Sequence, residues 1–359
     1  MDIEKRLDLI TGVGEEIITR DELRQLLETK QHPIAYDGFE PSGLAHLPFG
    51  IFRPLLLKDL VKAGVKFKLW LADWFAWINN KMNGDLEAIQ KVGEYFVEVW
   101  KAGGVKGVEY LWASENMDSE YWKRVVLIAK NTTVNRATRA LTIMGRKEGE
   151  MGEVAQYFYP IMQASDIFQL KCDMTQLGLD QRRANILARE VGPKLGLWKP
   201  VVVSHHMLMG LEGVKKSEGF EENKNIDAEI SSKMSKSKPQ TCIFVHDSKD
   251  DIKNKLKKAY CPEKVIDNNP VLEYCKYLIF RSFGEMEINR PEKFGGDVSF
   301  ESYNELEEAF RTGKIHPLDL KNAVSENLDK MIEPIRTHFE KNAKAKKLYE
   351  FVKKQETTR

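Results

Sequence analysis

Short apolar runs alternate with amphipathic stretches along the first two thirds of the chain. The runs at 34–35, 65–72, 108–115 and 201–206 have the composition of buried strands, and the segments between them place apolar residues at helical intervals. This alternation predicts an α/β fold with a parallel, Rossmann-like sheet. Asp73 follows the run 65–72 directly, so a parallel strand there would bring its carboxylate to the ligand-binding edge.

Helical spacing dominates both ends of the chain. Residues 1–30 carry apolar positions three and four apart, and beyond residue 243 one helical pattern follows another. The helices expected there are 250–259, 271–280, 303–310, 318–339 and 343–354. We therefore expect an N-terminal helical segment (1–30), an α/β domain (31–242) and an all-helical C-terminal domain (243–359).

The composition describes a globular protein that is soluble in water, because 42% of the residues are hydrophobic and 30% are charged. A net charge of +1 provides no overall basic field, so local patches would have to hold any nucleic acid. The four cysteines form no CxxC pair, which argues against zinc and against a disulfide framework. There is no signal-peptide core, and the most apolar run, 67–78, is too short to span a bilayer. These features predict a cytoplasmic protein.

Residues 34–50 predict a strand, a turn and a helix in direct succession. The turn contains Gly38 and Gly43, with His46 and Pro48 just before the helical pattern begins. Such a turn can present backbone N–H groups and the positive end of a helix dipole to an anion. Chance glycines in a strand–turn–helix are common, so this segment alone does not establish a phosphate site.

A second candidate for phosphate binding is the segment 233–237, which reads KMSKS. Two lysines and two serines in a polar loop can fold over a triphosphate and supply positive charge and hydroxyl donors. A solvated lysine-rich loop is the alternative. The preceding residues 212–232 are polar and charged, and predict an irregular, mobile loop that carries the KMSKS segment.

Together these segments resemble the class I aminoacyl-tRNA synthetases, whose "HIGH" and KMSKS signatures are similar to AHLPFG and KMSKS here. Other stretches resemble the archaeal and eukaryotic tyrosyl-tRNA synthetases over nearly the whole chain and in the same order. They are YDGFEPSG, LADWFAWINNKMNGD, YPIMQASDI, LGLDQRRANILARE, AYCPEKV, RPEKFGGD and HPLDLKNAV. The resemblance implies a tyrosine–tRNA ligase with a catalytic α/β domain and an anticodon-binding C-terminal domain.

The resemblance also implies a tyrosine site. Tyr36 and Asp166 match the pair that hydrogen-bonds the substrate phenol, whereas Tyr159, Gln163 and Gln181 match the positions that hold its α-amino group. Helical spacing independently places Tyr159, Gln163 and Asp166 on one face. Surface or capping duty remains the alternative for any one of them taken singly.

For ATP, the resemblance implies catalytic roles for His46, Lys233 and Lys236 and the presence of Mg²⁺. The implied ATP-binding residues are Gly38, Glu40, His46, Gly50, Asp180, Lys233, Met234, Ser235, Lys236 and Ser237. The chain departs from the first signature at Pro48 and Phe49, where glycine and histidine are usual. Because proline also removes a backbone donor, we expect the KMSKS segment to carry more of the phosphate stabilisation.

A tRNA partner is implied at two places. Residues 121–147 contain seven basic and no acidic residues, which predicts a face toward a polyanion or another subunit, with a merely solvated face as the alternative. By resemblance, Arg139, Arg182 and Arg183 meet the acceptor stem; ion pairs across a subunit interface are the alternative for Arg139. Phe294 and Asp319 match positions that read the anticodon guanine, and Cys261 matches a nearby contact.

The family also implies a homodimer, and the apolar and aromatic residues between Trp100 and Trp122 would suit its interface. Two alternative functions remain open within this architecture: a tryptophanyl-tRNA synthetase, or a catalytically inactive tRNA-binding paralogue, which Pro48 and Phe49 suggest. A nucleotidyltransferase of similar fold would leave the anticodon-like motifs of the C-terminal domain unexplained.

Overall fold

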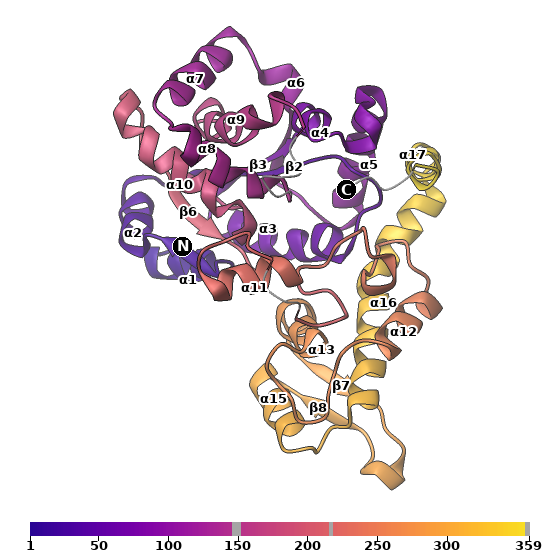
Figure 1. The fold of residues 1–359 in the computed structure, drawn as a ribbon. Helices are drawn as coiled ribbons and strands as arrows, with labels where there is room; N and C mark the ends of the chain where they lie inside the picture. Colours follow the sequence, from indigo (N-terminus) through magenta and orange to yellow (C-terminus); the bar gives the residue numbers. More distant parts are fainter. Residues whose placement is uncertain (146–151, 215–217, 356–359) are drawn as a thin grey trace.

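The computed structural model describes residues 1–145, 152–214 and 218–355, and Figure 1 shows an α/β part followed by a mainly helical part. The first part is built on a six-stranded sheet with the order β1-β6-β5-β2-β3-β4. Its strands are β1 (Glu16–Ile18), β2 (Ile34–Phe39), β3 (Lys66–Leu71), β4 (Val108–Trp112), β5 (Met174–Thr175) and β6 (Val201–Ser204). All pairs are parallel except β1 with β6. The predicted α/β fold with a mostly parallel sheet is confirmed.

Eleven α-helices in the described residues surround or flank this sheet. They are α1 (Ile3–Thr11), α2 (Arg20–Thr29), α3 (Arg53–Lys62), α4 (Asp73–Ile78), α5 (Leu86–Ala102), α6 (Ala113–Asn116), α7 (Ser119–Lys130), α8 (Val134–Ala140), α9 (Ala155–Gln169), α10 (Arg182–Val191) and α11 (Lys224–Ser232). One apolar cluster joins the sheet to α1, α3 and α5, and a second joins β2 and β3 to α7, α9 and α10. Both clusters are apolar because alternate residues of the parallel strands face opposite layers of helices.

The remaining helices form the second part. They are α12 (Lys249–Lys257), α13 (Pro270–Tyr274), α14 (Phe280–Phe283), α15 (Tyr303–Arg311), α16 (Pro317–Lys341) and α17 (Ala343–Lys353). α17 packs against α5 of the first part (Figure 1). No helix in the described ranges combines enough length and apolar character to cross a membrane.

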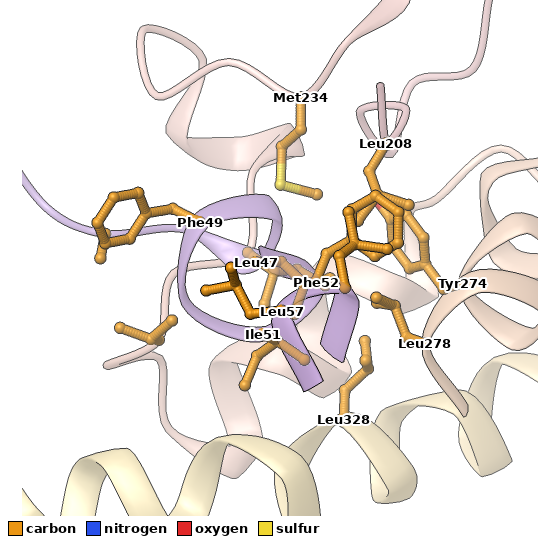
Figure 2. Close-up of a cluster of buried hydrophobic side chains, with 14 of the residues drawn as sticks. Leu47, Phe49, Ile51, Phe52, Leu57, Leu208, Met234, Tyr274, Leu278 and Leu328 are labelled. Carbon is orange, nitrogen blue, oxygen red and sulfur yellow. The ribbon is translucent and has the colours of Figure 1, made fainter. Parts of the chain in front are cut away.

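One hydrophobic cluster runs across the junction between the two parts. Figure 2 shows Phe52 and Leu57, from the helix that follows the β2 turn, beside Tyr274, Leu278 and Leu328 of the second part. All five side chains are buried to at least 97%. Because burial of this extent removes a continuous apolar surface from water, the two parts share one core rather than meeting through a linker.

Three local expectations were wrong. The N-terminal 30 residues are interrupted by β1, which adds antiparallel to β6, so that segment is not wholly helical. The expected irregular stretch before the KMSKS segment contains α11. The C-terminal part is mainly but not entirely helical, since β7 (Met286–Ile288) and β8 (Val298–Phe300) pair antiparallel. Such short strands leave too little periodicity to distinguish them from the surrounding helical pattern.

Candidate functional site

A cavity of about 600 Å³ lies beyond the carboxyl ends of the parallel strands. β2 has β3 on one side and β5 on the other, so the chain connections diverge at this point of the sheet. Open parallel sheets bind ligands at such a switch point, because the strand ends and the loops that follow them converge there. The residues expected at a phenol, at an amino group and at phosphates line this one cavity, except Gly50. They are Tyr36, Gly38, Glu40, His46, Tyr159, Gln163, Asp166, Asp180, Gln181, Lys233, Met234, Ser235, Lys236 and Ser237.

Tyr36 and Asp166 are fully buried residues of the cavity lining. Tyr36 extends from β2, and its hydroxyl donates to the Gln163 carbonyl at 3.4 Å. Asp166 lies on α9, where its carboxylate accepts from the Tyr121 hydroxyl at 2.8 Å. Burial raises the pKa of Asp166 well above its usual value, although the bond from Tyr121 opposes the shift. A buried carboxyl beside two phenols is suited to bind a further hydroxyl group, because an unpaired buried polar group is costly.

Amide side chains and a carboxylate line the cavity together with Tyr36 and Asp166. Gln163 donates to the Gln181 side chain at 3.1 Å, and Gln181 donates to the Ile143 carbonyl at 3.1 Å. The Tyr159 hydroxyl donates to Glu40 at 2.6 Å. Since Tyr159, Gln163 and Asp166 all line the cavity, the prediction that they share one face of a helix is confirmed. Their oxygens provide the acceptors that an ammonium group requires.

The KMSKS segment lines the same cavity. Lys233 forms an ion pair with Asp180 at 2.6 Å, and the Lys236 ammonium donates to the Ser42 carbonyl and, at 3.2 Å, to its hydroxyl. Burial lowers the pKa of Lys236 to about 8. Burial also lowers the pKa of His46 well below its usual value, and the neighbouring lysines add to the shift. A neutral imidazole with two ammonium groups is an arrangement that fits a polyanion.

The turn before α3 does not offer the row of free backbone donors that the sequence suggested. The Leu47 N–H donates to the Ile243 carbonyl, and the N–H groups of Phe49 and Gly50 both donate to the backbone carbonyl of His46. Pro48 has no N–H. Gly50 is not among the cavity-lining residues: a Cβ there would lie 2.4 Å from Val245 Cγ1, so its smallness serves close packing. Positive charge at this end therefore comes from the lysines rather than from the turn.

Phe49 occupies the position of the expected second signature histidine, and its ring belongs to the core. It lies 4.2 Å from the Phe96 ring and stacks at 4.5 Å on Trp100. Figure 2 shows the same ring beside the apolar residues of the turn. Trp100 is itself fully buried, so its expected place in a subunit interface was wrong.

Asp73 does not line the cavity, contrary to expectation. Its carboxylate accepts from the Ser114 N–H at 3.0 Å, from the Ser114 hydroxyl at 2.6 Å and from Gln90 at 3.1 Å. A fully buried carboxylate with these donors joins the ends of β3 and β4 to α5. Its function in this structure is to hold these elements together.

Each of the three arginines expected at an acceptor stem is paired with a glutamate in the structure. Arg139 lies 2.5 Å from Glu222, Arg182 lies 2.8 Å from Glu16, and Arg183 lies 3.2 Å from Glu221. The other basic residues of this stretch lie on α7 and α8, except Arg146 and Lys147, which lie outside the described residues. These ion pairs are within one chain, so a polyanion would compete with the glutamates for the guanidinium groups.

The residues expected near an anticodon lie in the second part of the molecule. The Phe294 ring is 59% exposed, Asp319 lies in the first turn of α16, and Cys261 is buried. Arg290 connects the Phe294 turn to the start of this helix, since it donates to the Gly296 and Lys314 carbonyls at 2.9 Å each. The exposed Phe294 ring is compatible with stacking on an unpaired base, and the Asp319 carboxylate lies in the same part of the molecule.

Several cavity residues were missed by the sequence reasoning. Asp37 and Arg53 form a buried ion pair at 3.4 Å, in which burial raises the pKa of the carboxyl and lowers that of the guanidinium. Trp70 and His205 also line the cavity, and Tyr121 holds Asp166 from behind. Asp37 could have been suspected, because it follows Tyr36 at the carboxyl end of a predicted strand. Nothing local distinguishes the others.

Three comparisons with known proteins bear on this site. The family model described as "tRNA synthetases class I (W and Y)" matches residues 28–227 and 226–333. The chain is 43% identical to "Tyrosine--tRNA ligase 1, cytoplasmic" of Arabidopsis thaliana, covering all of this chain and 90% of that protein. It is 44% identical to the tyrosine–tRNA ligase of Thermococcus sibiricus, covering 95% of this chain and 96% of that one. The solved Pyrococcus horikoshii tyrosyl-tRNA synthetase, in complex with L-tyrosine, superposes with a TM-score of 0.89 at 41% identity, covering 98% of this chain and all of that one.

Proposed function

Because this chain belongs to the class I tyrosyl-tRNA synthetases of archaeal and eukaryotic type, and is a tyrosine–tRNA ligase, we propose that its cavity binds tyrosine and ATP end to end. The observation that carries this proposal is the composition of the cavity lining. The buried phenol of Tyr36 and carboxyl of Asp166 line the same cavity as the ammonium groups of Lys233 and Lys236. Tyrosine would enter with its phenol against Asp166 and its carboxylate toward the lysines.

In the first step, the tyrosine carboxylate attacks the α-phosphorus of ATP and the bond to pyrophosphate breaks, which leaves tyrosyl-adenylate. The enzyme needs no covalent nucleophile, so catalysis consists of positioning and charge stabilisation. Tyr159, Gln163 and Gln181 hold the ammonium group and thereby orient the carboxylate. In the second step, the 3′-terminal adenosine of tRNA-Tyr attacks the tyrosyl carbonyl, and AMP leaves.

The ATP end is assigned to Gly38, Glu40, His46, Asp180 and the segment 233–237. Lys233 and Lys236 balance the negative charge that moves onto the leaving pyrophosphate, and the Ser235 and Ser237 hydroxyls, 2.8 Å apart, supply further donors. Mg²⁺ enters as part of the MgATP substrate, and the carboxylates of Glu40 and Asp180 line the same cavity. Gly50 contributes to this end by allowing close packing behind the turn.

We assign the acceptor stem to Arg139, Arg182 and Arg183. Arg139 and its partner Glu222 are both more than 40% exposed, so RNA phosphates can exchange with the carboxylate at small cost. The Arg183–Glu221 pair is nearly buried, so its guanidinium would change partner only if the segment before α11 moved.

The second part, residues 243–359, is proposed as the anticodon-binding domain, with residues 31–242 as the catalytic domain. Its support is the exposed Phe294 ring and the Asp319 carboxylate in the first turn of α16, which suit an unpaired guanine that stacks on the ring and donates to the carboxylate. Cys261, which is buried and accepts from Asn269 at 3.5 Å, would shape the pocket rather than contact a base.

Replacing Phe294 by alanine is expected to lower kcat/KM for tRNA-Tyr by about 5- to 150-fold, because stacking on one base contributes about 1–3 kcal/mol. Tyrosine-dependent pyrophosphate exchange in the absence of tRNA stays unchanged, since the ring lies in the second part of the molecule. Aminoacylation and exchange are measured on the same preparation. Equal losses in both assays would contradict the anticodon assignment.

A homodimer in the cytoplasm is the proposed assembly and location, as the family and the name of the Arabidopsis relative imply. Exposed apolar side chains on α4, α7 and α8 support an interface: Trp77, Val126, Leu127 and Val134. In the same region the Trp74 ring lies 6.0 Å from the Trp77 ring and 6.1 Å from the Trp122 ring. A patch of this kind marks a protein contact more often than a free surface.

Pyrophosphate exchange with single amino acids tests the proposed substrate. Tyrosine is expected to support exchange, whereas tryptophan and phenylalanine are not, because a buried carboxyl placed for a phenol is left unpaired by either. Tyrosyl-tRNA synthetases are themselves the standard illustration of this rule. Exchange with tryptophan alone would establish the tryptophanyl alternative. Binding of tRNA-Tyr without any exchange would establish the inactive paralogue.

A further inference from the structure

His206 lies just beyond β6, with its ring held between two carboxylates from different parts of the molecule. Nδ1 is 2.8 Å from Glu229 on α11, and Nε2 is 3.0 Å from Glu273 on α13. The ring stacks on Tyr277 at 4.3 Å, and its side chain is only 14% exposed. One imidazole thus connects the catalytic sheet, the helix before the KMSKS segment and the second part.

The same two carboxylates also hold the backbone that follows His206. Glu229 accepts from the Met207 N–H at 2.9 Å, and Glu273 accepts from the Met209 N–H at 2.7 Å. In each carboxylate the same oxygen, Oε1, contacts the ring and accepts from the backbone N–H. Residues 206–209 form a strip that is fixed between α11 and α13.

The KMSKS segment is paired with this strip. Met234 N–H donates to the Leu208 carbonyl at 2.7 Å, Gly210 N–H donates to the Ser232 carbonyl at 2.9 Å, and Met209 bridges to Lys233 in antiparallel fashion. From this position Lys233 reaches Asp180 inside the cavity. The strip is the surface against which the KMSKS backbone is positioned.

The charge on His206 follows from its surroundings. Burial alone would lower the pKa of the ring, but Glu229 and Glu273 raise it to about 10, so the ring is an imidazolium at neutral pH. The other groups around it are Glu15 at 4.0 Å, the Tyr277 ring and the adjacent His205, whose pKa burial lowers. Glu15, His206 and Glu229 lie close enough to suggest a cation site. A protonated ring, however, has no lone pair for a metal.

We propose that His206 is a positioning residue of the ligation reaction: it clamps Glu229 and Glu273 so that the strip 206–209 holds Lys233 and Lys236 at the ATP end of the cavity. The inference rests on the proposed role of those two lysines. In this arrangement α13, in the second part of the molecule, supports the KMSKS segment through Glu273. Loss of the imidazolium leaves two neighbouring carboxylates without their shared cation and loosens the strip.

The test is tyrosine-dependent pyrophosphate exchange by His206→Gln, with His338→Gln as the matched control. His338 of α16 also binds a carboxylate of the first part, Glu98, at 2.9 Å, but this pair does not contact the strip. His206→Gln is expected to lower kcat at least tenfold with KM for tyrosine within twofold, whereas His338→Gln stays within twofold in both. Unchanged kcat in His206→Gln, or equal losses in both variants, overturns the inference.

Glu273→Gln provides a second, milder variant that keeps an acceptor for the Met209 N–H. It is expected to lower kcat for exchange although Glu273 lies outside the catalytic domain, and the double variant with His206→Gln is expected to be no slower than His206→Gln alone. Additive losses would mean that the two residues act separately and would overturn the clamp. Lys236→Met separates the two proposals. If this variant retains pyrophosphate exchange, the proposed function of the KMSKS lysines is wrong. If Lys236→Met loses exchange while His206→Gln and Glu273→Gln keep it, only the proposed role of His206 is wrong.

Discussion

Substitution of Asp166 by alanine is expected to lower kcat/KM for tyrosine by about 5- to 150-fold and to reduce the preference for tyrosine over phenylalanine. The carboxyl is fully buried and lines the cavity together with Tyr36. Without it the substrate hydroxyl is buried with one partner fewer, which costs about 1–3 kcal/mol, whereas phenylalanine loses nothing. Pyrophosphate exchange at varied concentrations of both amino acids measures the two effects.

Tyr121→Phe is the matched control for Asp166→Ala. It removes the hydroxyl that donates to Asp166 but leaves the carboxyl in place, and Tyr121 is not among the cavity-lining residues. We expect a smaller loss of kcat/KM and an unchanged preference for tyrosine. If Asp166→Ala charges tRNA with unaltered selectivity, the orientation proposed for the amino acid is wrong.

Lys236→Met is expected to lower kcat for tyrosyl-adenylate formation by about 10²- to 10³-fold, the usual cost of removing one positioned donor from developing charge. The Lys236 ammonium is buried and contacts only Ser42 and the face of Phe96 among the described polar and aromatic contacts. Its charge is therefore available to phosphate oxygens. Single-turnover formation of the adenylate measures the effect without a contribution from tRNA.

The lowered pKa of Lys236, about 8, adds a pH dependence to the same step. Below this value the side chain is charged and balances the phosphates; above it the neutral amine does not. We expect kcat/KM for ATP to fall about tenfold between pH 7 and pH 9. Lys238→Met is the control for both measurements, because Lys238 is half exposed and paired with Glu212 at 3.2 Å. A similar loss in that variant would show a general effect of charge in the segment.

The site was predictable where its chemistry depends on local spacing. Helical intervals place Tyr159, Gln163 and Asp166 together on α9, and the KMSKS lysines are contiguous. Tyr121 was not predictable, because its bond to Asp166 joins residues 45 apart in sequence and a buried aromatic residue on α7 is typical of ordinary core packing. His206 was missed for the same reason, since its two carboxylates come from distant helices.

The fold was predictable where runs were long and patterned. The positions of β3, β6 and α5 follow from composition and periodicity alone. Asp85 stands directly before the helical pattern of α5, and its side chain caps that helix. β1 was not predictable, because Ile17 and Ile18 fit a helix face as well as a strand, and the partner β6 begins at Val201. Pro48 and Phe49 show a further limit: the departure from the signature is visible in the sequence, but only the structure shows that the Phe49 ring stacks on Trp100 while Phe49 still lines the cavity.

β1 has a consequence for how much of the N-terminus the protein can lose. Three residues, Glu16–Ile18, cover the outer edge of β6, and the Glu15 N–H adds a bond to the Ser204 carbonyl at 2.7 Å. Without them β6 would present its unpaired backbone to solvent, which is a template for intermolecular strand addition. The first eighteen residues therefore protect this edge from intermolecular pairing. A chain without them is expected to aggregate even though the residues that line the cavity are still present.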